Sequence, residues 1–223
     1  MKYRCVIFDL DGTLADTVSE LAAAINRALD AEASVLPRVS VEYIRSMQGN
    51  SLENMLRNLS DRAADGQNGA FGEKFITGLT EKVLGAFDMS RYGARPYNGI
   101  EELLACLRRK KLKLGVLSNK PDRAAALEAA ALFPRFEFDF VRGVITGEPF
   151  KPDPASVWNI LAELDAGTGS TILVGDSATD MKTALNAECL PVGVSWGYFD
   201  AALLKEAGAR FIINEPEELL DLL

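Results

Sequence analysis

The stretch RCVIFDLDGTLADT, residues 4–17, decides the fold because it joins a short apolar run to two closely spaced aspartates. The apolar run, residues 4–8, predicts a buried strand that ends at Asp9. Side chains alternate along a strand, so Asp9 and Asp11 project in the same direction. Two like charges this close are costly unless a cation or a proton lies between them. The stretch therefore predicts an acidic site at the end of the first strand.

Gly12 and Thr13 complete this motif. Gly12 permits a sharp backbone turn, and Thr13 supplies a hydroxyl at that turn. In the functional interpretation, Asp9 is a nucleophile and a metal ligand, and Asp11 donates a proton to the leaving oxygen. In the structural interpretation, the two aspartates belong to an ordinary loop or an Asx turn. The motif alone does not separate these two interpretations.

After this stretch the pattern of apolar residues becomes helical. Leu21, Ile25 and Leu29 recur at helical spacing, and helical patterning continues to about residue 87. No strand is expected between Leu14 and Tyr92. This pattern predicts a helical insertion placed directly after the first strand.

From residue 97 onward, predicted helices and strands alternate. The expected strands are residues 113–118, 139–144, 171–175, 191–195 and 210–213, with helices at 100–110, 123–131, 154–164 and 179–187. Strands separated by helices of this length favour βαβ units and a mostly parallel, Rossmann-like α/β sheet. Ligands of such sheets bind beyond the carboxyl ends of the strands, where the strand order switches.

Polar side chains follow several of these strands. Ser118 and Asn119 precede a helix, where a hydroxyl and backbone N–H groups suit a phosphate, although a plain helix cap would look the same. Lys151 lies in the stiff loop FKPDP, which could aim its ammonium inward, and a solvated surface lysine is the alternative. Asp176 and Asp180 in GDSATD offer the carboxylates that Mg²⁺ requires, and an acidic N-terminal helix turn is the alternative.

Several classes of enzyme are excluded by what the chain lacks. It contains no histidine, so histidine phosphatases, Ser-His-Asp hydrolases and His-liganded zinc sites are excluded. The positions six after each cysteine are Asp11, Leu112 and Ser195, so the Cys-x5-Arg loop of cysteine phosphatases is missing. A GxxxxGK[ST] phosphate loop is missing too. Acid–base chemistry therefore falls to carboxylates, lysine, tyrosine or water.

Charge and cysteine usage indicate the kind of partner and compartment. The net charge of −8 disfavours nucleic acid and anionic membranes, because their phosphates would be repelled. The three cysteines are odd in number and far apart, which favours a reducing cytoplasm. No apolar run is long enough for a signal peptide or a membrane span. We therefore expect a cytoplasmic monomer or homodimer whose partner is a small phosphorylated metabolite.

Together, DLDGT, the serine of LSNK, the lysine of FKPDP and GDSATD resemble the haloacid dehalogenase superfamily in residue type, order and position. The resemblance extends over essentially the whole chain, including the helical insertion, which corresponds to the cap of that superfamily. Within it, the strings DLDGTLADT, PYNGI, LSNK, FKPDP, VGDSATD and GVSWGY are most similar to phosphoglycolate phosphatases. The resemblance implies a core domain of residues 1–15 and 91–223 and a helical cap domain of residues 16–90.

The resemblance also implies a role for each motif residue. Asp9 would be the nucleophile and an Mg²⁺ ligand, and Asp11 would be the general acid–base and would bind the metal through its backbone carbonyl. Asp176 would bind the metal, with Asp180 in support. The phosphoryl group would be held by three polar residues and one cation, namely Thr13, Ser118, Asn119 and Lys151. The implied reaction is Mg²⁺-dependent hydrolysis of a small phosphate monoester, foremost 2-phosphoglycolate, through an aspartyl-phosphate.

The cap would set the choice of substrate. Arg45 and Asn50 lie in a polar turn around Gly49, and Arg45 could bind a substrate carboxylate. A helix-connecting turn with a surface arginine would look the same. A sugar-phosphate mutase, another small-molecule phosphatase such as a pyrophosphatase, and a non-catalytic binding protein stay open as alternatives. Trp196 and Tyr198 are expected to pack in the core or at its rim.

Overall fold

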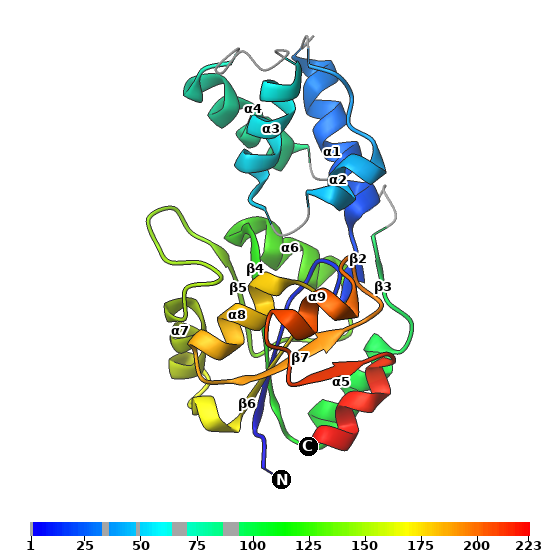
Figure 1. The fold of residues 1–223 in the computed structure, drawn as a ribbon, viewed down its shortest axis with the longest axis vertical. Coiled ribbons are helices and arrows are strands. Elements are labelled where there is room, and N and C mark those ends of the chain that lie inside the picture. The colour runs from blue at the N-terminus through cyan, green and yellow to red at the C-terminus, as the bar shows by residue number, and fades with distance from the viewer. Residues whose placement is uncertain (1, 33–35, 48–49, 64–70, 87–93) are drawn as a thin grey trace. The chain divides into compact units, whose positions relative to one another are not determined.

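The computed structural model describes residues 2–32, 36–47, 50–63, 71–86 and 94–223. The chain divides into two compact units, which we call the core unit and the helical unit. The core unit comprises Met1–Asp16 and Arg95–Leu223, and the helical unit comprises Thr17–Ala94. The chain therefore leaves the core unit after Asp16 and returns to it at Arg95 (Figure 1).

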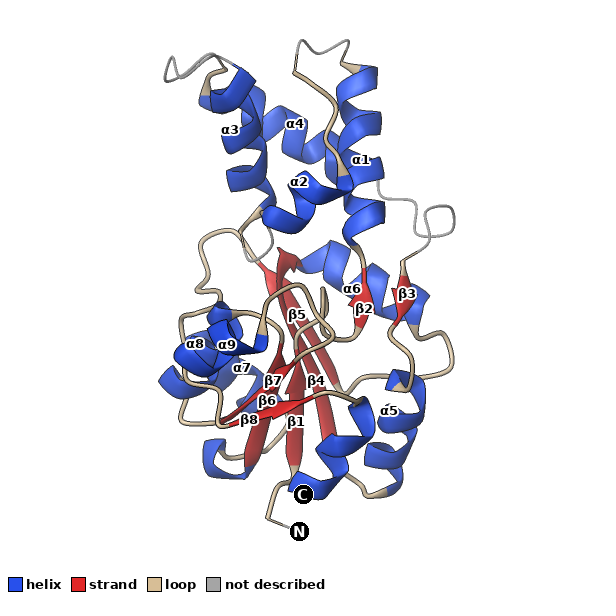
Figure 2. Cartoon of the chain, turned by 45° about the vertical axis from the view of Figure 1, so that its right-hand side comes forward, coloured by secondary structure: helices blue, strands red, loops and turns tan. Residues whose placement is uncertain are grey.

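The core unit is a parallel sheet covered by helices (Figure 2). Its six strands, in the order β5-β4-β1-β6-β7-β8, are β5 (Phe140–Val144), β4 (Lys113–Pro121), β1 (Cys5–Phe8), β6 (Thr171–Gly175), β7 (Leu190–Val194) and β8 (Phe211–Ile213). Its α-helices are α5 (Ile100–Arg109), α6 (Asp122–Leu132), α7 (Ala155–Glu163), α8 (Ala178–Asn186) and α9 (Ala201–Glu206). Two 3₁₀ helices, η1 (Thr168–Ser170) and η2 (Pro216–Leu222), complete it. The predicted α/β class is confirmed.

Strand β1 lies in the middle of the sheet, where the strand order switches. The chain runs from β1 to β4 and β5 on one side and then returns to β6 on the other side. All four residues of β1 are buried, as the apolar sequence of a central parallel strand requires. Phe8 pairs in register with Val116 of β4 and Val174 of β6. The segments that follow these three residues therefore meet at one edge of the sheet, beside the switch point.

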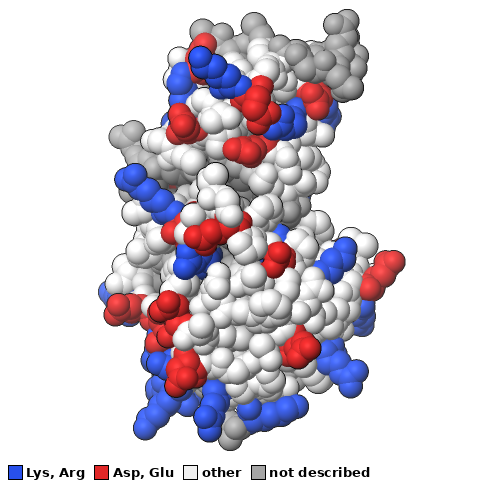
Figure 3. All heavy atoms as spheres, turned by 90° about the vertical axis from the view of Figure 1, so that its left-hand side faces the viewer, with Lys and Arg blue, Asp and Glu red and all other residues white. Residues whose placement is uncertain are grey.

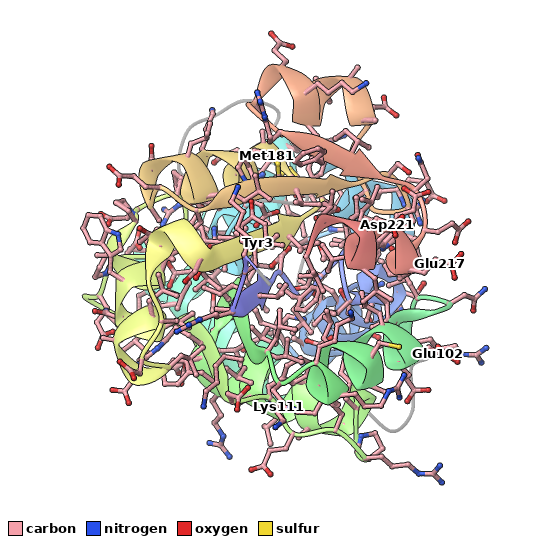
Figure 4. All side chains as sticks on the ribbon, turned by 90° about the horizontal axis from the view of Figure 1, so that it is seen from below. Tyr3, Glu102, Lys111, Met181, Glu217 and Asp221 are labelled. Carbon is pink, nitrogen blue, oxygen red and sulfur yellow. The ribbon has the colours of Figure 1, made fainter. Side chains whose placement is uncertain are left out.

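The opposite edge carries the amino ends of the strands. Figure 4 is viewed from that side, where the labelled Tyr3 precedes β1 and Lys111 precedes β4.

On the face shown in Figure 3, basic and acidic side chains are interspersed, and a group of basic side chains gathers along the lower edge. None of the helices in the described ranges is both long and apolar enough to cross a bilayer.

Three predictions about individual elements were wrong or incomplete. Residues Ala15–Asp16 form a short strand, β2, which pairs antiparallel with β3 (Arg95–Pro96), whereas no strand was expected between Leu14 and Tyr92. A two-residue strand is too short to show alternation. Strand β4 continues three residues beyond its predicted end at Ser118, to Pro121, so Asn119 lies inside the strand rather than after it. Helix α9 has no counterpart among the predicted elements.

The helical unit contains α1 (Val18–Ala31), α2 (Val41–Ser46), α3 (Leu52–Ala63) and α4 (Glu73–Gly85). Helix α1 contacts α2 and α4, and α3 contacts α4. Each helix buries an apolar face, with Ile25, Leu56 and Ile76 among the fully buried side chains. Removing such faces from water stabilises the unit by about 1.5–3 kcal/mol for each large side chain. The expected helical insertion therefore has a core of its own.

Candidate active site

Three buried carboxylates converge at the carboxyl ends of β1 and β6. Asp9 directly follows β1, Asp176 directly follows β6, and Asp180 lies in the first turn of α8. One carboxylate oxygen from each lies within 4.8 Å of the others. The residues are 7%, 2% and 0% exposed, respectively. Buried carboxylate oxygens at this spacing are the ligands that a hard divalent cation prefers, so the three residues fit a site for such a cation.

Lys151 neutralises part of this charge. Its Nζ donates hydrogen bonds of 2.7 Å to Oδ1 of Asp9 and to Oδ1 of Asp180. Burial alone would lower the pKa of Lys151, but the charges of Asp180 and Asp9 outweigh it and raise the pKa above its usual value. The lysine is therefore charged at neutral pH. Its loop is anchored from β4, because Asn119 Nδ2 donates to the carbonyl oxygen of Lys151.

One lysine does not balance three buried carboxylates. Burial, reinforced by the charge of Asp180, raises the pKa of Asp9 to about 7, although Lys151 acts in the opposite direction. Burial and the charge of Asp9 likewise raise the pKa of Asp176 well above its usual value. Without a further cation the cluster therefore favours a bound proton near neutral pH. A divalent cation would remove the need for that proton.

Asp180 has a structural role and a site role at once. The backbone N–H and the hydroxyl of Ser177 donate to its Oδ2, at 3.0 and 2.6 Å, and the Asp180 N–H donates back to Ser177 Oγ. This capping box begins α8. Its other oxygen, Oδ1, faces Lys151. The helix-cap interpretation and the functional interpretation of GDSATD are therefore compatible.

Asp11 lies outside the three-carboxylate group found in the described residues. Its Oδ1 accepts a 2.8 Å hydrogen bond from Lys120 Nζ, and its Oδ2 lies 3.4 Å from Ser118 Oγ. Lys120 in turn pairs with the buried Glu128 of α6. No role was predicted for Lys120 or Glu128, because in the sequence they are only charges at a strand end and on an alanine-rich helix.

Thr13 and Asn119 contain polar atoms that other protein groups do not satisfy. Within the described part of the chain, neither Thr13 Oγ1 nor Asn119 Oδ1 has a hydrogen-bond partner, and both atoms are buried. Such atoms are costly unless a ligand or water reaches them. Ser118 is 2% exposed and borders Asp11. Of the residues predicted to hold a phosphoryl group, Ser118 thus lies beside Asp11, and Asn119 lies beside the Lys151 loop, to which its amide nitrogen donates.

The segment after β7 holds Asp176 and the DLDGT turn in place, although Trp196 and Tyr198 were expected only to pack. The backbone N–H of Tyr198 donates to Asp176 Oδ2 at 2.7 Å, and Trp196 Nε1 donates to the carbonyl oxygen of Thr13. A Cβ on Gly197 would lie 2.3 Å from the Cβ of Asp176, so only glycine fits there. The string SWGY was visible in the sequence, but a backbone donor leaves no signature in it.

The two cap residues lie in the helical unit. Arg45 is exposed near the end of α2, and Asn50 is exposed in the turn that follows. Asn50 Nδ2 donates to the carbonyl oxygen of Met47, which stabilises this turn. Gln48 and Gly49 lie outside the described residues, as does the expected cap boundary at residue 90.

Comparison with known proteins places this geometry in a family. Residues 6–194 match the model of the haloacid dehalogenase-like hydrolases. A phosphoglycolate phosphatase of Neisseria meningitidis is 33% identical to the chain, in an alignment that covers 98% of this chain and 92% of the relative. One of Chromobacterium violaceum is 31% identical, over 99% of this chain and 96% of the relative. The crystal structure of a predicted phosphoglycolate phosphatase from Haemophilus somnus superimposes with a TM-score of 0.88 at 23% identity, over 100% of this chain and 98% of that one.

These comparisons confirm the resemblance on which the sequence analysis relied. The structural likeness extends over both units, and the sequence likeness extends over nearly the full length of curated phosphatases. The chain therefore belongs to the haloacid dehalogenase-like hydrolase family, in which it is a phosphoric monoester hydrolase.

Proposed function

We propose that this protein hydrolyses 2-phosphoglycolate to glycolate and phosphate by transient transfer of the phosphoryl group to Asp9. The observation that carries the proposal is the contact between Asp9 and Lys151, a buried carboxylate held 2.7 Å from a buried ammonium at the switch point of the sheet. A carboxylate in this position is a nucleophile with a fixed direction of attack. The similarity to curated phosphoglycolate phosphatases supports the choice of substrate.

The first step is attack by a carboxylate oxygen of Asp9 on phosphorus. The bond between phosphorus and the ester oxygen breaks, and Asp11 gives its proton to the departing oxygen. Thr13 Oγ1 and Ser118 Oγ are the side-chain donors proposed to hold the phosphoryl oxygens. The buried, unpartnered state of Thr13 Oγ1 within the described residues supports this role, because a phosphoryl oxygen would satisfy it.

The second step returns the enzyme to its starting state. Asp11, now a carboxylate, takes a proton from a water molecule whose oxygen attacks the phosphorus of the aspartyl-phosphate. The bond between phosphorus and Asp9 then breaks, and inorganic phosphate leaves. Dividing the hydrolysis into two displacements replaces one very slow reaction by two faster ones. Lys151 stays charged throughout and stabilises the negative charge on the transferring group.

We propose Mg²⁺ as the cofactor, held by Asp9 and Asp176 with support from Asp180. The fit rests on the three buried carboxylates and on the raised pKa of Asp9 and of Asp176. The ion would supply charge neutralisation at the phosphoryl oxygens. Tyr198 orients Asp176 for this role through its backbone N–H.

We further propose that the helical unit acts as a cap that selects the substrate. Its residues differ slightly from the expected cap range of 16–90, because the structural division falls at Thr17 and Ala94. Arg45 is the proposed partner of the substrate carboxylate, and Asn50 shapes its turn.

The three cysteines, which form no disulfide, suit the cytoplasm as the compartment.

Phosphate release from a substrate panel tests the proposal. The panel contains 2-phosphoglycolate, sugar phosphates, nucleotides and pyrophosphate, each with Mg²⁺ or EDTA, for the wild type and Asp9→Asn. We expect Mg²⁺-dependent release that is highest for 2-phosphoglycolate and lost in Asp9→Asn. A higher rate with another ester would correct the substrate, and transfer of phosphate between sugar positions would identify a mutase. No release from any compound would overturn the proposed function.

A further inference from the structure

Lys120 is a buried cation to which the reaction described above gives no role. It lies near the end of β4, and its side chain is 7% exposed. Nζ of Lys120 donates a 2.8 Å hydrogen bond to Asp11 Oδ1 and forms a second ion pair with Glu128 of α6. The side chain of Glu128 is 1% exposed, whereas that of Asp11 is 19% exposed. The lysine thus links a fully buried carboxylate to one at the edge of the site.

The backbone is shaped to aim Lys120 at Asp11. Strands β4 and β5 pair Leu117 with Arg142 and Pro121 with Val144, so residues 118–120 stand opposite Gly143 alone. This bulge changes the direction in which the intervening side chains project. It also brings the carbonyl oxygen of Lys120 against β5.

Gly143 is required by that close approach. A Cβ on Gly143 would lie 2.4 Å from the carbonyl oxygen of Lys120 and 2.5 Å from Cα of Asp122. The Gly143 N–H donates to Asp122 Oδ1 at 2.9 Å, which fastens the start of α6 to β5. Helix α6 carries Glu128. The bulge, the glycine and the helix therefore fix both ends of the Lys120 side chain.

We propose that Lys120 is a positioning residue for Asp11 and that Glu128 holds Lys120 in place. The inference rests on the proposed function, in which Asp11 protonates the leaving oxygen. Lys120 occupies Oδ1 of Asp11, so Oδ2, beside Ser118, is the oxygen directed toward the phosphoryl group. A carboxyl group held in one rotamer transfers its proton more often than one that samples several.

If Lys120 served only to stabilise the fold, an ion pair with Glu128 would be sufficient, and no contact with Asp11 would be needed. Lys120 and Glu128 alone would join β4 to α6, and their loss would affect stability but not the choice among substrates. Asp11 comes from a third segment, 109 residues away in sequence from Lys120. The difference between the two roles is measurable, because leaving groups differ in their need for a proton.

The test compares kcat/KM for 2-phosphoglycolate and for p-nitrophenyl phosphate. The alkoxide of glycolate needs a proton to leave, whereas p-nitrophenolate leaves without one. For a two-step phosphatase, kcat/KM reports the steps up to departure of the first product, so the second step does not obscure the comparison. The wild type is compared with three variants: Lys120→Met, Glu128→Gln and the double variant that combines them. Lys205→Met, which removes an exposed lysine of α9, is the matched control.

We expect both variants that lack Lys120 to lower the ratio of the two kcat/KM values by about tenfold or more, since general acid catalysis contributes about 10²–10⁴. The double variant also removes the charge of Glu128, the more deeply buried partner of Lys120, so it keeps the test valid if Lys120→Met alone unfolds. Glu128→Gln should lower the ratio less, and Lys205→Met should leave it unchanged. In an Asp11→Asn background, removal of Lys120 should change the ratio no further.

Two negative results have different meanings. A wild type that hydrolyses neither ester would contradict the proposed function itself. A wild type that hydrolyses both, together with Lys120 variants whose ratio is unchanged or raised, would overturn the role of Lys120 alone. Equal loss on both esters would also overturn it, because that is the result of a merely structural ion pair.

Discussion

Asp180 Oδ1 and Lys151 Nζ lie 2.7 Å apart in two buried side chains, while the second oxygen of Asp180 caps α8. One side chain therefore connects the start of a helix to the cation beside the nucleophile. The direction of Lys151 therefore depends on the same residue that completes the capping box at the start of α8.

Asp180→Asn should impair the site more than it impairs the helix. The amide keeps an oxygen that can accept from Ser177, so the cap is partly preserved. Lys151 loses one of its two anionic partners, and removal of one member of a buried pair costs about 3 kcal/mol or more. We expect kcat to fall by about 10²-fold with helix content retained, measured by steady-state kinetics and circular dichroism. Unchanged kcat would show that Asp180 only caps α8.

The pH dependence of stability should reveal the crowded carboxylates. The pKa of Asp9 is raised from 3.8 to about 7 in the folded protein. Between these values the folded state binds a proton that the unfolded chain does not. The resulting stability is complete below the lower value and is lost as the pH rises through about 7.

The direction of this pH dependence can be checked by measuring urea unfolding in the presence of EDTA. The free energy of unfolding of the wild type should decline more steeply between pH 5 and pH 7, by on the order of 1–3 kcal/mol, than that of Asp9→Asn. The variant is the control, since it lacks the titrating group and is otherwise isosteric. Mg²⁺ should flatten the difference, because the metal replaces the proton. Parallel pH profiles in EDTA would contradict the raised pKa of Asp9.

Gly197→Ala should weaken metal binding through Asp176. The new methyl group would lie 2.3 Å from Asp176 Cβ and 2.6 Å from the carbonyl oxygen of Gly12, so both must move. We expect a Mg²⁺ affinity about tenfold lower, measured as the Mg²⁺ dependence of activity and by calorimetry. Gly169→Ala is the control, because nothing lies within 4 Å of a Cβ there. Equal Mg²⁺ affinity in both variants would show that the SWGY segment does not position Asp176.

Thr13→Val should separate stability from phosphate binding. The hydroxyl has no hydrogen-bond partner in the described protein, so its removal costs the fold little, within about 0.5 kcal/mol. The proposed bond to a phosphoryl oxygen is lost, so KM should rise about tenfold and inhibition by inorganic phosphate should weaken in parallel. Thr13→Ser, which keeps the hydroxyl, should retain most of the affinity. A loss of stability without a change in KM would assign Thr13 to the core instead.

Much of the fold could be predicted because its signals are local. Apolar runs such as residues 171–175 and the helices between them give clear periodicities, and the structure places those strands within one residue of the predicted ends, except at β4. The parallel order then brings Asp9 and Asp176 to one edge without further information. These two residues follow paired strands directly, so their meeting was a consequence of topology.

The remainder of the site depends on contacts that no short stretch contains. The link between Lys120 and Asp11 requires the bulge in β4, which a periodicity cannot reveal because Ser118 and Asn119 look like the end of a strand. The Tyr198 donor is a backbone group, and every residue except proline has one. Pairing of β2 with β3 joins segments on either side of the helical unit and involves only two residues on each side.

Chemical trapping of the phosphorylated enzyme tests the central claim most directly. The wild type and Asp9→Asn are mixed with radiolabelled 2-phosphoglycolate and Mg²⁺, quenched in acid within a turnover, digested and mapped by mass spectrometry. We predict a hydroxylamine-sensitive phosphoryl group on the peptide that contains Asp9, absent from Asp9→Asn. Release of phosphate by the wild type with no label on that peptide, or label that persists in Asp9→Asn, would contradict the account.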